Sequence, residues 1–96
     1  MTNALVDKNI LGWGDKHSEE LLKRYEKIIK VGEGELPQRS VDQKIALYCK
    51  ENDCDLFTGD STAYTHYFEA RIHAVKITQY DWIKEGDNPV FLIQII

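Results

Sequence analysis

Apolar residues along the chain form short runs, and the spacing within each run predicts a strand or a helix. The run from Ala4 to Val6 is partly β-branched and is ended by the turn-forming Asp7, which predicts a buried strand. Between Ser18 and Lys30 apolar residues recur at helical spacing, which predicts a helix. Because short apolar runs fit either state, residues 28–32 are interpreted as a second strand that follows a shorter helix.

A loop and a second helix are predicted next. Glycines and a proline mark residues 31–39 as the loop. Ser40 and Gln43 then match a capping box, which predicts a helix from about residue 41 to residue 50. The expected buried stripe of this helix consists of Val41, Ile45, Tyr48 and Cys49.

The rest of the chain predicts three strands and one more helix. Cys54 to Thr58 is an apolar run, Ser61 to Ala70 is interpreted as a helix, and His73 to Gln79 alternates like a strand. After a turn at residues 85–89, the almost continuously apolar segment from Val90 to Ile96 predicts a strand that is covered on both faces. Left uncovered, such a strand would promote association, so the alternative is a homodimer.

The alternation of strands and helices favours an α/β domain. Right-handed crossovers keep consecutive strands parallel, and only the last strand, which follows a turn, is expected to run antiparallel. We therefore expect a three-layer α/β/α arrangement around a mostly parallel central sheet. With 96 residues the chain has room for a single domain that spans residues 1–96.

Charge and composition narrow the classes of function. The formal net charge is −4, with 16 acidic and 12 basic residues, so a broad basic surface for nucleic acid is not expected and any such contact must be local. No apolar stretch approaches the ~18 residues that a membrane span needs, and the start of the chain lacks a secretory pattern. The expected location is the cytoplasm, where Cys49 and Cys54 would be reduced and buried.

Three acidic residues fall where the predicted sheet would bring them together. Asp7 and Asp60 each follow a strand, and the helix that begins near Asp42 starts at the same edge because it runs antiparallel to the strands. Three neighbouring carboxylates repel one another unless a cation neutralises them, and Mg²⁺ or Mn²⁺ prefers such oxygen ligands. Each acid also has a purely structural interpretation, as a turn residue, a favourable helix-start charge or a helix cap.

Two stretches resemble PIN domains. The first is LVDKNIL, residues 5–11, which is similar to their opening strand. The second is SVDQKIALYCKENDCDLFTGD, residues 40–60, which is similar to the helix and strand that carry their later acids. The shortness of the chain resembles compact PIN-like proteins more than the longer VapC-type toxins.

The resemblance implies a PIN-like ribonuclease that cuts single-stranded RNA. Asp7, Asp42 and Asp60 would be its catalytic residues and would hold Mg²⁺ or Mn²⁺. Contacts to RNA are expected from Lys8, Asn9, Arg39, Thr58 and Thr62. In a toxin–antitoxin pair, an antitoxin protein would be the partner.

The chain also departs from the PIN pattern, which leaves alternatives open. The glutamate that longer PIN domains carry on an intervening helix has no clear counterpart, and Thr62 stands where short relatives often have an acid. These departures favour a PIN-like domain with weak or lost catalysis that serves as a protein or RNA interaction module. A receiver-like signalling domain is a third alternative, although its usual pair of early acids is absent.

Overall fold

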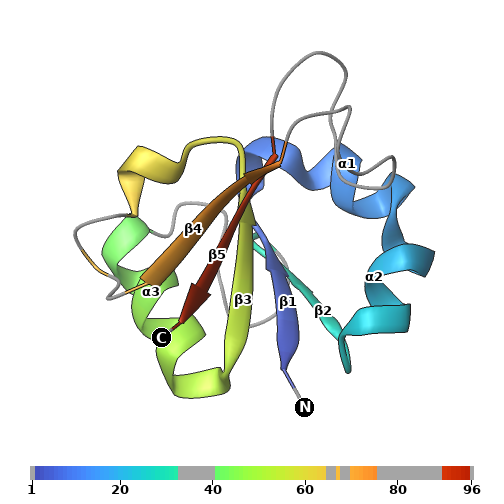
Figure 1. Ribbon diagram of the computed structural model, residues 1–96, viewed down its shortest axis with the longest axis horizontal. Helices are drawn as coiled ribbons and strands as arrows, with labels where there is room; N and C mark the ends of the chain where they lie inside the picture. The colour runs from blue at the N-terminus through green and yellow to red at the C-terminus, as the bar shows by residue number, and fades with distance from the viewer. Residues whose placement is uncertain (1, 33–40, 65–66, 68–69, 76–89, 96) are drawn as a thin grey trace.

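The chain folds as an α/β domain, shown in Figure 1. This computed structural model describes residues 2–32, 41–64, 67, 70–75 and 90–95, with the backbone alone at 61, 70–75 and 95. Within these residues the elements are β1 (Asn3–Val6), η1 (Lys8–Ile10), α1 (Leu11–Lys16), α2 (Ser18–Arg24), β2 (Ile28–Lys30), α3 (Asp42–Asn52), β3 (Cys54–Thr58), η2 (Ser61–Ala63), β4 (Ala70–Val75) and β5 (Val90–Ile95).

The strands form one sheet in the order β2-β1-β3-β5-β4. β1 pairs in parallel with both β2 and β3, whereas β5 lies antiparallel between β3 and β4. Four strands therefore share one direction, which confirms the expected mostly parallel sheet with an antiparallel last strand. β5 has a hydrogen-bonded neighbour on each side, and its Val90 and Ile93 are buried in the two different core clusters of the domain.

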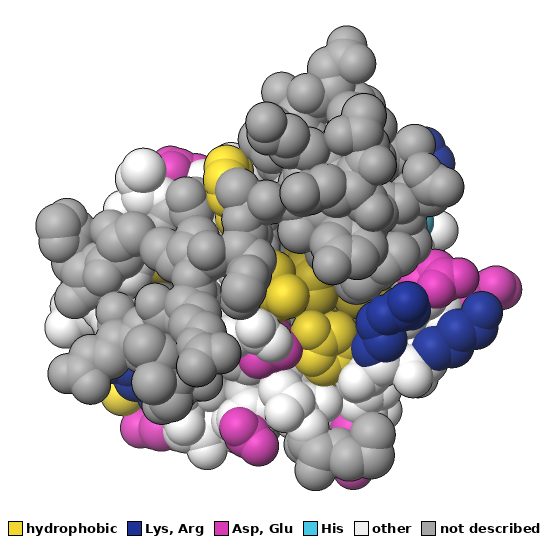
Figure 2. All heavy atoms as spheres, in the orientation of Figure 1, with side chains coloured by type: hydrophobic (Ala, Val, Ile, Leu, Met, Phe, Trp, Pro, Cys, Tyr) yellow, Lys and Arg dark blue, Asp and Glu magenta, His cyan; other side chains and the backbone are white. Residues whose placement is uncertain are grey.

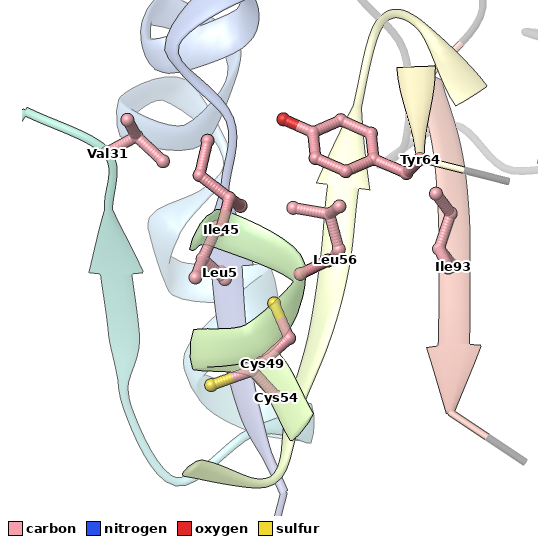
Figure 3. Packing of buried hydrophobic residues seen from close by; sticks show 9 residues of the cluster. Leu5, Val31, Ile45, Cys49, Cys54, Leu56, Tyr64 and Ile93 are labelled. Carbon is pink, nitrogen blue, oxygen red and sulfur yellow. The ribbon is translucent and has the colours of Figure 1, made fainter. Parts of the chain in front are cut away.

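Apolar side chains of the central strands alternate between two core clusters, as the two-residue period of a strand requires. In β1, Leu5 packs in the cluster that contains Ile45 of α3, whereas Ala4 and Val6 belong to the cluster that contains residues of α1 and α2. Figure 3 shows the first cluster, in which Leu56 of β3 lies beside Leu5. Asp7 and Thr58 continue the Leu5 and Leu56 faces of their strands.

α3 begins one residue later than the capping-box pattern predicts. Its N-cap is Val41, whose side chain makes no capping hydrogen bond, so the predicted cap is wrong. Val41 precedes the first helical turn and is 65% exposed, which also overturns its expected place in the buried stripe. Ile45 and Cys49 are buried as expected, and Ala46 joins them. The helix ends at Asn52, and its C-cap Asp53 adopts the left-handed conformation with φ 55°.

The segment between Ser18 and Lys30 follows the interpretation of a short helix and a strand, here α2 and β2. The predicted helix from Ser61 to Ala70 is wrong where the structure describes it. Residues 61–63 form only the 3-10 turn η2, and Ala70 already begins β4. Ala70 pairs with Ile95 of β5, so the ladder hydrogen bonds override the predicted helix at this residue.

Several predictions fall on residues that the structure does not describe. These are the loop residues 33–39, which include Arg39, the strand residues 76–79 and the turn at 85–89. None of the described helices has the length and apolar character needed to cross a membrane. Cys49 and Cys54 are both buried thiols without a disulfide.

Candidate active site

Asp7 lies directly after β1, at the carboxyl end of the parallel strands, and is only 3% exposed. Its Oδ2 atom accepts hydrogen bonds from the Thr58 hydroxyl and from the Tyr64 hydroxyl, each at 2.8 Å. Its Oδ1 atom accepts a third hydrogen bond, at 2.7 Å, from the backbone N–H of Lys8. An ionised carboxylate can only accept hydrogen bonds, so these three donors satisfy most of the hydrogen-bonding capacity of the buried Asp7 side chain.

Thr58 is the last residue of β3 and connects Asp7 with the chain that leads to Asp60. Its side chain is fully buried, and Oγ1 accepts a 3.1 Å hydrogen bond from the backbone N–H of Asp60 while it donates to Asp7. The hydroxyl therefore fixes the ends of β1 and β3 relative to each other.

The Tyr64 hydroxyl lies beside two carboxylates that come from different elements. It donates to Asp7, and the Asp42 carboxylate in the first turn of α3 lies close enough for its negative charge to act on this hydroxyl. Burial raises the pKa of Tyr64 well above its ordinary value, and the charges of Asp7 and then Asp42 raise this pKa further. In Figure 3 the hydroxyl points toward the side of the cluster where Val31 and Ile45 lie.

Asp60 is exposed and makes a local turn with Thr62. Its Oδ1 atom accepts hydrogen bonds from the Thr62 hydroxyl at 2.7 Å and from the Thr62 backbone N–H at 3.2 Å. The preceding Gly59 donates its N–H to the Asn9 side chain at 3.1 Å. Residues that follow β1 thus hold the backbone just before Asp60.

The three predicted acids are not equally close to one another. Asp7 and Asp42 both lie near the Tyr64 hydroxyl, whereas Asp60 is linked to Asp7 through the contact of its backbone N–H with Thr58. Within the described ranges no three histidine, cysteine or acidic side chains are arranged to hold a metal ion. The oxygen donors at this edge suit Mg²⁺ or Mn²⁺ in chemistry, but the geometry brings two of the three carboxylates together.

The residues expected to contact RNA differ in how accessible they are. Lys8, Asn9 and Thr62 are exposed at or near the carboxyl edge. Thr58 has no exposed surface, so its side chain positions Asp7 and does not face a substrate. Arg39 lies outside the described residues.

Basic side chains beside α2 are paired with acids. Glu20 accepts from Arg24 at 2.9 Å and from Lys23 at 3.4 Å, and Figure 2 shows basic and acidic side chains next to each other in this region. The Arg24 hydrogen bond and the Lys23 charge lower the pKa of Glu20. Lys30 of β2 pairs with Asp15 of α1 in the same way. These cations are compensated locally, in agreement with the acidic composition.

Tyr64 is the site residue that the sequence pattern did not reveal. It stood in the middle of a predicted helix, among other aromatic residues, where it had no special position. A turn at residues 61–63 instead returns the chain toward β1 and carries the Tyr64 ring into the core. The sequence feature that could have identified Tyr64 is its position, a few residues after Asp60 in the short segment that follows a strand.

The chain was compared with family models, with curated proteins and with solved structures. None of the three comparisons found a match.

Proposed function

We propose that the chain is a PIN-like ribonuclease that uses Mg²⁺ or Mn²⁺ to hydrolyse single-stranded RNA. The observation that carries the proposal is the meeting of Asp7 and Asp42 at one hydroxyl, at the carboxyl edge of the sheet. Asp7 follows β1 and Asp42 begins α3, and the two acids are 35 positions apart in the sequence. Sites in open α/β sheets form at this edge.

Hydrogen-bond counting supports a cation at this place. A tyrosine hydroxyl has one hydrogen, so it cannot donate fully to Asp7 and Asp42 at the same time. Two carboxylates that face each other across one hydrogen repel unless further positive charge is present. A divalent cation held by Asp7 and Asp42, with Asp60 as the third acid of the edge, would supply that charge.

The chemistry follows from this arrangement. When bound, Mg²⁺ or Mn²⁺ would activate water and stabilise the negative charge that develops on the phosphate oxygens. In the hydrolysis, a bond forms between the water oxygen and phosphorus as the bond to the leaving ribose oxygen breaks, and the leaving oxygen gains a proton. The exposed Lys8 and Asn9 are suited to orient the RNA by charge and hydrogen bonding.

The finer assignments belong to the same proposal. They comprise a three-layer PIN-like fold, a cytoplasmic location, an antitoxin partner if the chain is a toxin, and a homodimer. The support for three layers is that core residues of α3 lie in one cluster and those of α1 and α2 in the other.

The first test is cleavage of a labelled, mixed-sequence single-stranded RNA in Mn²⁺ or in EDTA. We expect cleavage by the wild type in Mn²⁺ only and none by Asp7→Asn, because the asparagine removes one negative charge from the edge. Circular dichroism of the variant provides the control for folding. Absence of cleavage by folded wild type across several RNAs would contradict the proposal.

A second candidate function is a PIN-like domain that binds RNA or protein without efficient catalysis. The observation that favours it is that Asp7 accepts three hydrogen bonds and Asp60 two, so protein donors already satisfy much of both carboxylates. Fluorescence anisotropy distinguishes this candidate, which predicts RNA binding without product in Mn²⁺.

A further inference from the structure

Tyr64 packs in the core and also donates a hydrogen bond to one of the proposed cation ligands, Asp7. Its side chain is 1% exposed, and its hydroxyl donates to Asp7 at 2.8 Å beside the Asp42 carboxylate. We propose that the Tyr64 hydroxyl competes with the cation: it holds Asp7 when no cation is bound and thereby sets the cation affinity. This inference rests on one part of the proposed function, which is the binding of a divalent cation by Asp7 and Asp42.

The competition follows from the acceptor atoms of Asp7. Oδ2 already accepts from Thr58 and Tyr64, and Oδ1 accepts from the Lys8 backbone, so three of about four lone-pair positions are occupied. The backbone donor and the fully buried Thr58 are fixed by the ends of the strands. Tyr64 follows the short turn η2, so of the three donors it is the one that does not come from a strand end.

A cation that takes Asp7 and Asp42 as ligands therefore competes with the Tyr64 hydroxyl for the Asp7 carboxylate. A hydrogen bond to a charged group is strong, and its loss reduces the apparent affinity for the cation. Tyr64→Phe removes the hydroxyl and keeps the buried ring. We expect this variant to bind Mn²⁺ about tenfold more tightly than the wild type, which corresponds to about 1.4 kcal/mol.

Tyr25→Phe is the matched control. The Tyr25 hydroxyl also donates to a carboxylate, Asp55, at 2.9 Å, but Tyr25 packs in the other core cluster. Titration of free Mn²⁺ by electron paramagnetic resonance, without RNA, should give the wild-type affinity for Tyr25→Phe. A tighter site in Tyr64→Phe alone supports the inference.

Other results overturn it, and they separate the two proposals. An unchanged or weaker affinity in Tyr64→Phe would show that the hydroxyl is a scaffold, while metal-dependent RNA cleavage by the wild type would leave the proposed function standing. Absence of Mn²⁺ binding by every variant, including the wild type, would overturn both.

A second measurement does not depend on the Tyr64→Phe variant folding. Mg²⁺ added to the wild type should change the near-ultraviolet tyrosine absorption, because the Tyr64 hydroxyl loses its carboxylate acceptor. The change should persist in Tyr25→Phe. A spectrum that stays constant while Mg²⁺ binds would contradict the displacement of Tyr64.

Discussion

Thr58 illustrates how a single hydroxyl can hold the candidate site together. Its Oγ1 atom donates to Asp7 and accepts from the backbone N–H of Asp60, in a position without solvent access. Thr58→Val keeps the shape but leaves both partners short of one hydrogen bond. We expect a loss of about 1–3 kcal/mol in the free energy of unfolding, measured with urea. Thr58→Ser keeps the hydroxyl and should lose less; equal losses in the two variants would contradict this role.

Tyr25 predicts a dependence of stability on alkaline pH. Burial and the neighbouring Asp55 raise the pKa of Tyr25 above its ordinary value of about 10. The folded protein therefore keeps a proton that the unfolded chain releases above pH 10. The contribution to stability is complete below pH 10 and falls above it, by up to about 1.4 kcal/mol per pH unit.

The measurement is the free energy of unfolding in urea between pH 8 and pH 11, with Tyr25→Phe beside the wild type. The variant lacks this ionisation, so its stability should fall less steeply above pH 10. Parallel curves for the two proteins would contradict the assignment.

At the scale of single residues, the sequence predicted positions better than contacts. That Asp7 and Asp42 lie at one edge followed from strand and helix directions, which local patterns specify. Their common neighbour Tyr64 and the full burial of Thr58 depend on how a turn returns toward β1. No local pattern encodes that return, because it is a tertiary contact.

The packing of α1 on β1 is so close that one residue must lack a side chain. A Cβ atom at Gly14 would lie 2.9 Å from Val6 Cγ1, whereas at Gly12 it would meet nothing within 4 Å. Gly14→Ala should therefore cost about 1–3 kcal/mol in the free energy of unfolding through overpacking. Gly12→Ala lies in the same helix and should be neutral or more stable by up to about 1 kcal/mol.

Thermal and urea unfolding of both variants provide the comparison. If Gly14→Ala is as stable as Gly12→Ala, then α1 does not rest on Val6 as described.

At the scale of helices and strands, the sequence predicted best those elements whose ends are marked by turn-forming residues. β1 and β3 are short apolar runs that end at turn-forming residues, and β3 has the predicted bounds. The predicted helix after Asp60 was wrong at its described ends, where residues 61–63 form η2 and Ala70 begins β4. Pairing of β4 with β5 across a long separation in sequence decides the state of Ala70. The predicted cap at Ser40 was wrong because Val41 occupies the cap position without a side-chain bond.

For the whole molecule, the directions of the strands are what bring the acids to one place. β1 and β3 run in parallel, so Asp7 and the residues after Thr58 leave the sheet at the same edge. α3 runs back between them in sequence, which brings Asp42 to that edge and Asp53 to the opposite end of the helix. Under the proposed function, this edge, and not the acidic surface of the chain as a whole, binds the cation and cleaves RNA.

The most direct measurement compares Asp42→Asn with Asp53→Asn for cleavage of labelled single-stranded RNA in Mn²⁺. Asp42→Asn removes a negative charge from the first turn of α3 and Asp53→Asn removes one from its C-cap, where asparagine tolerates the left-handed conformation. We predict that Asp42→Asn lowers the cleavage rate at least about a hundredfold, as expected when one charged group of an active site is removed, while Asp53→Asn keeps the wild-type rate. Equal rates in the two folded variants would contradict the account.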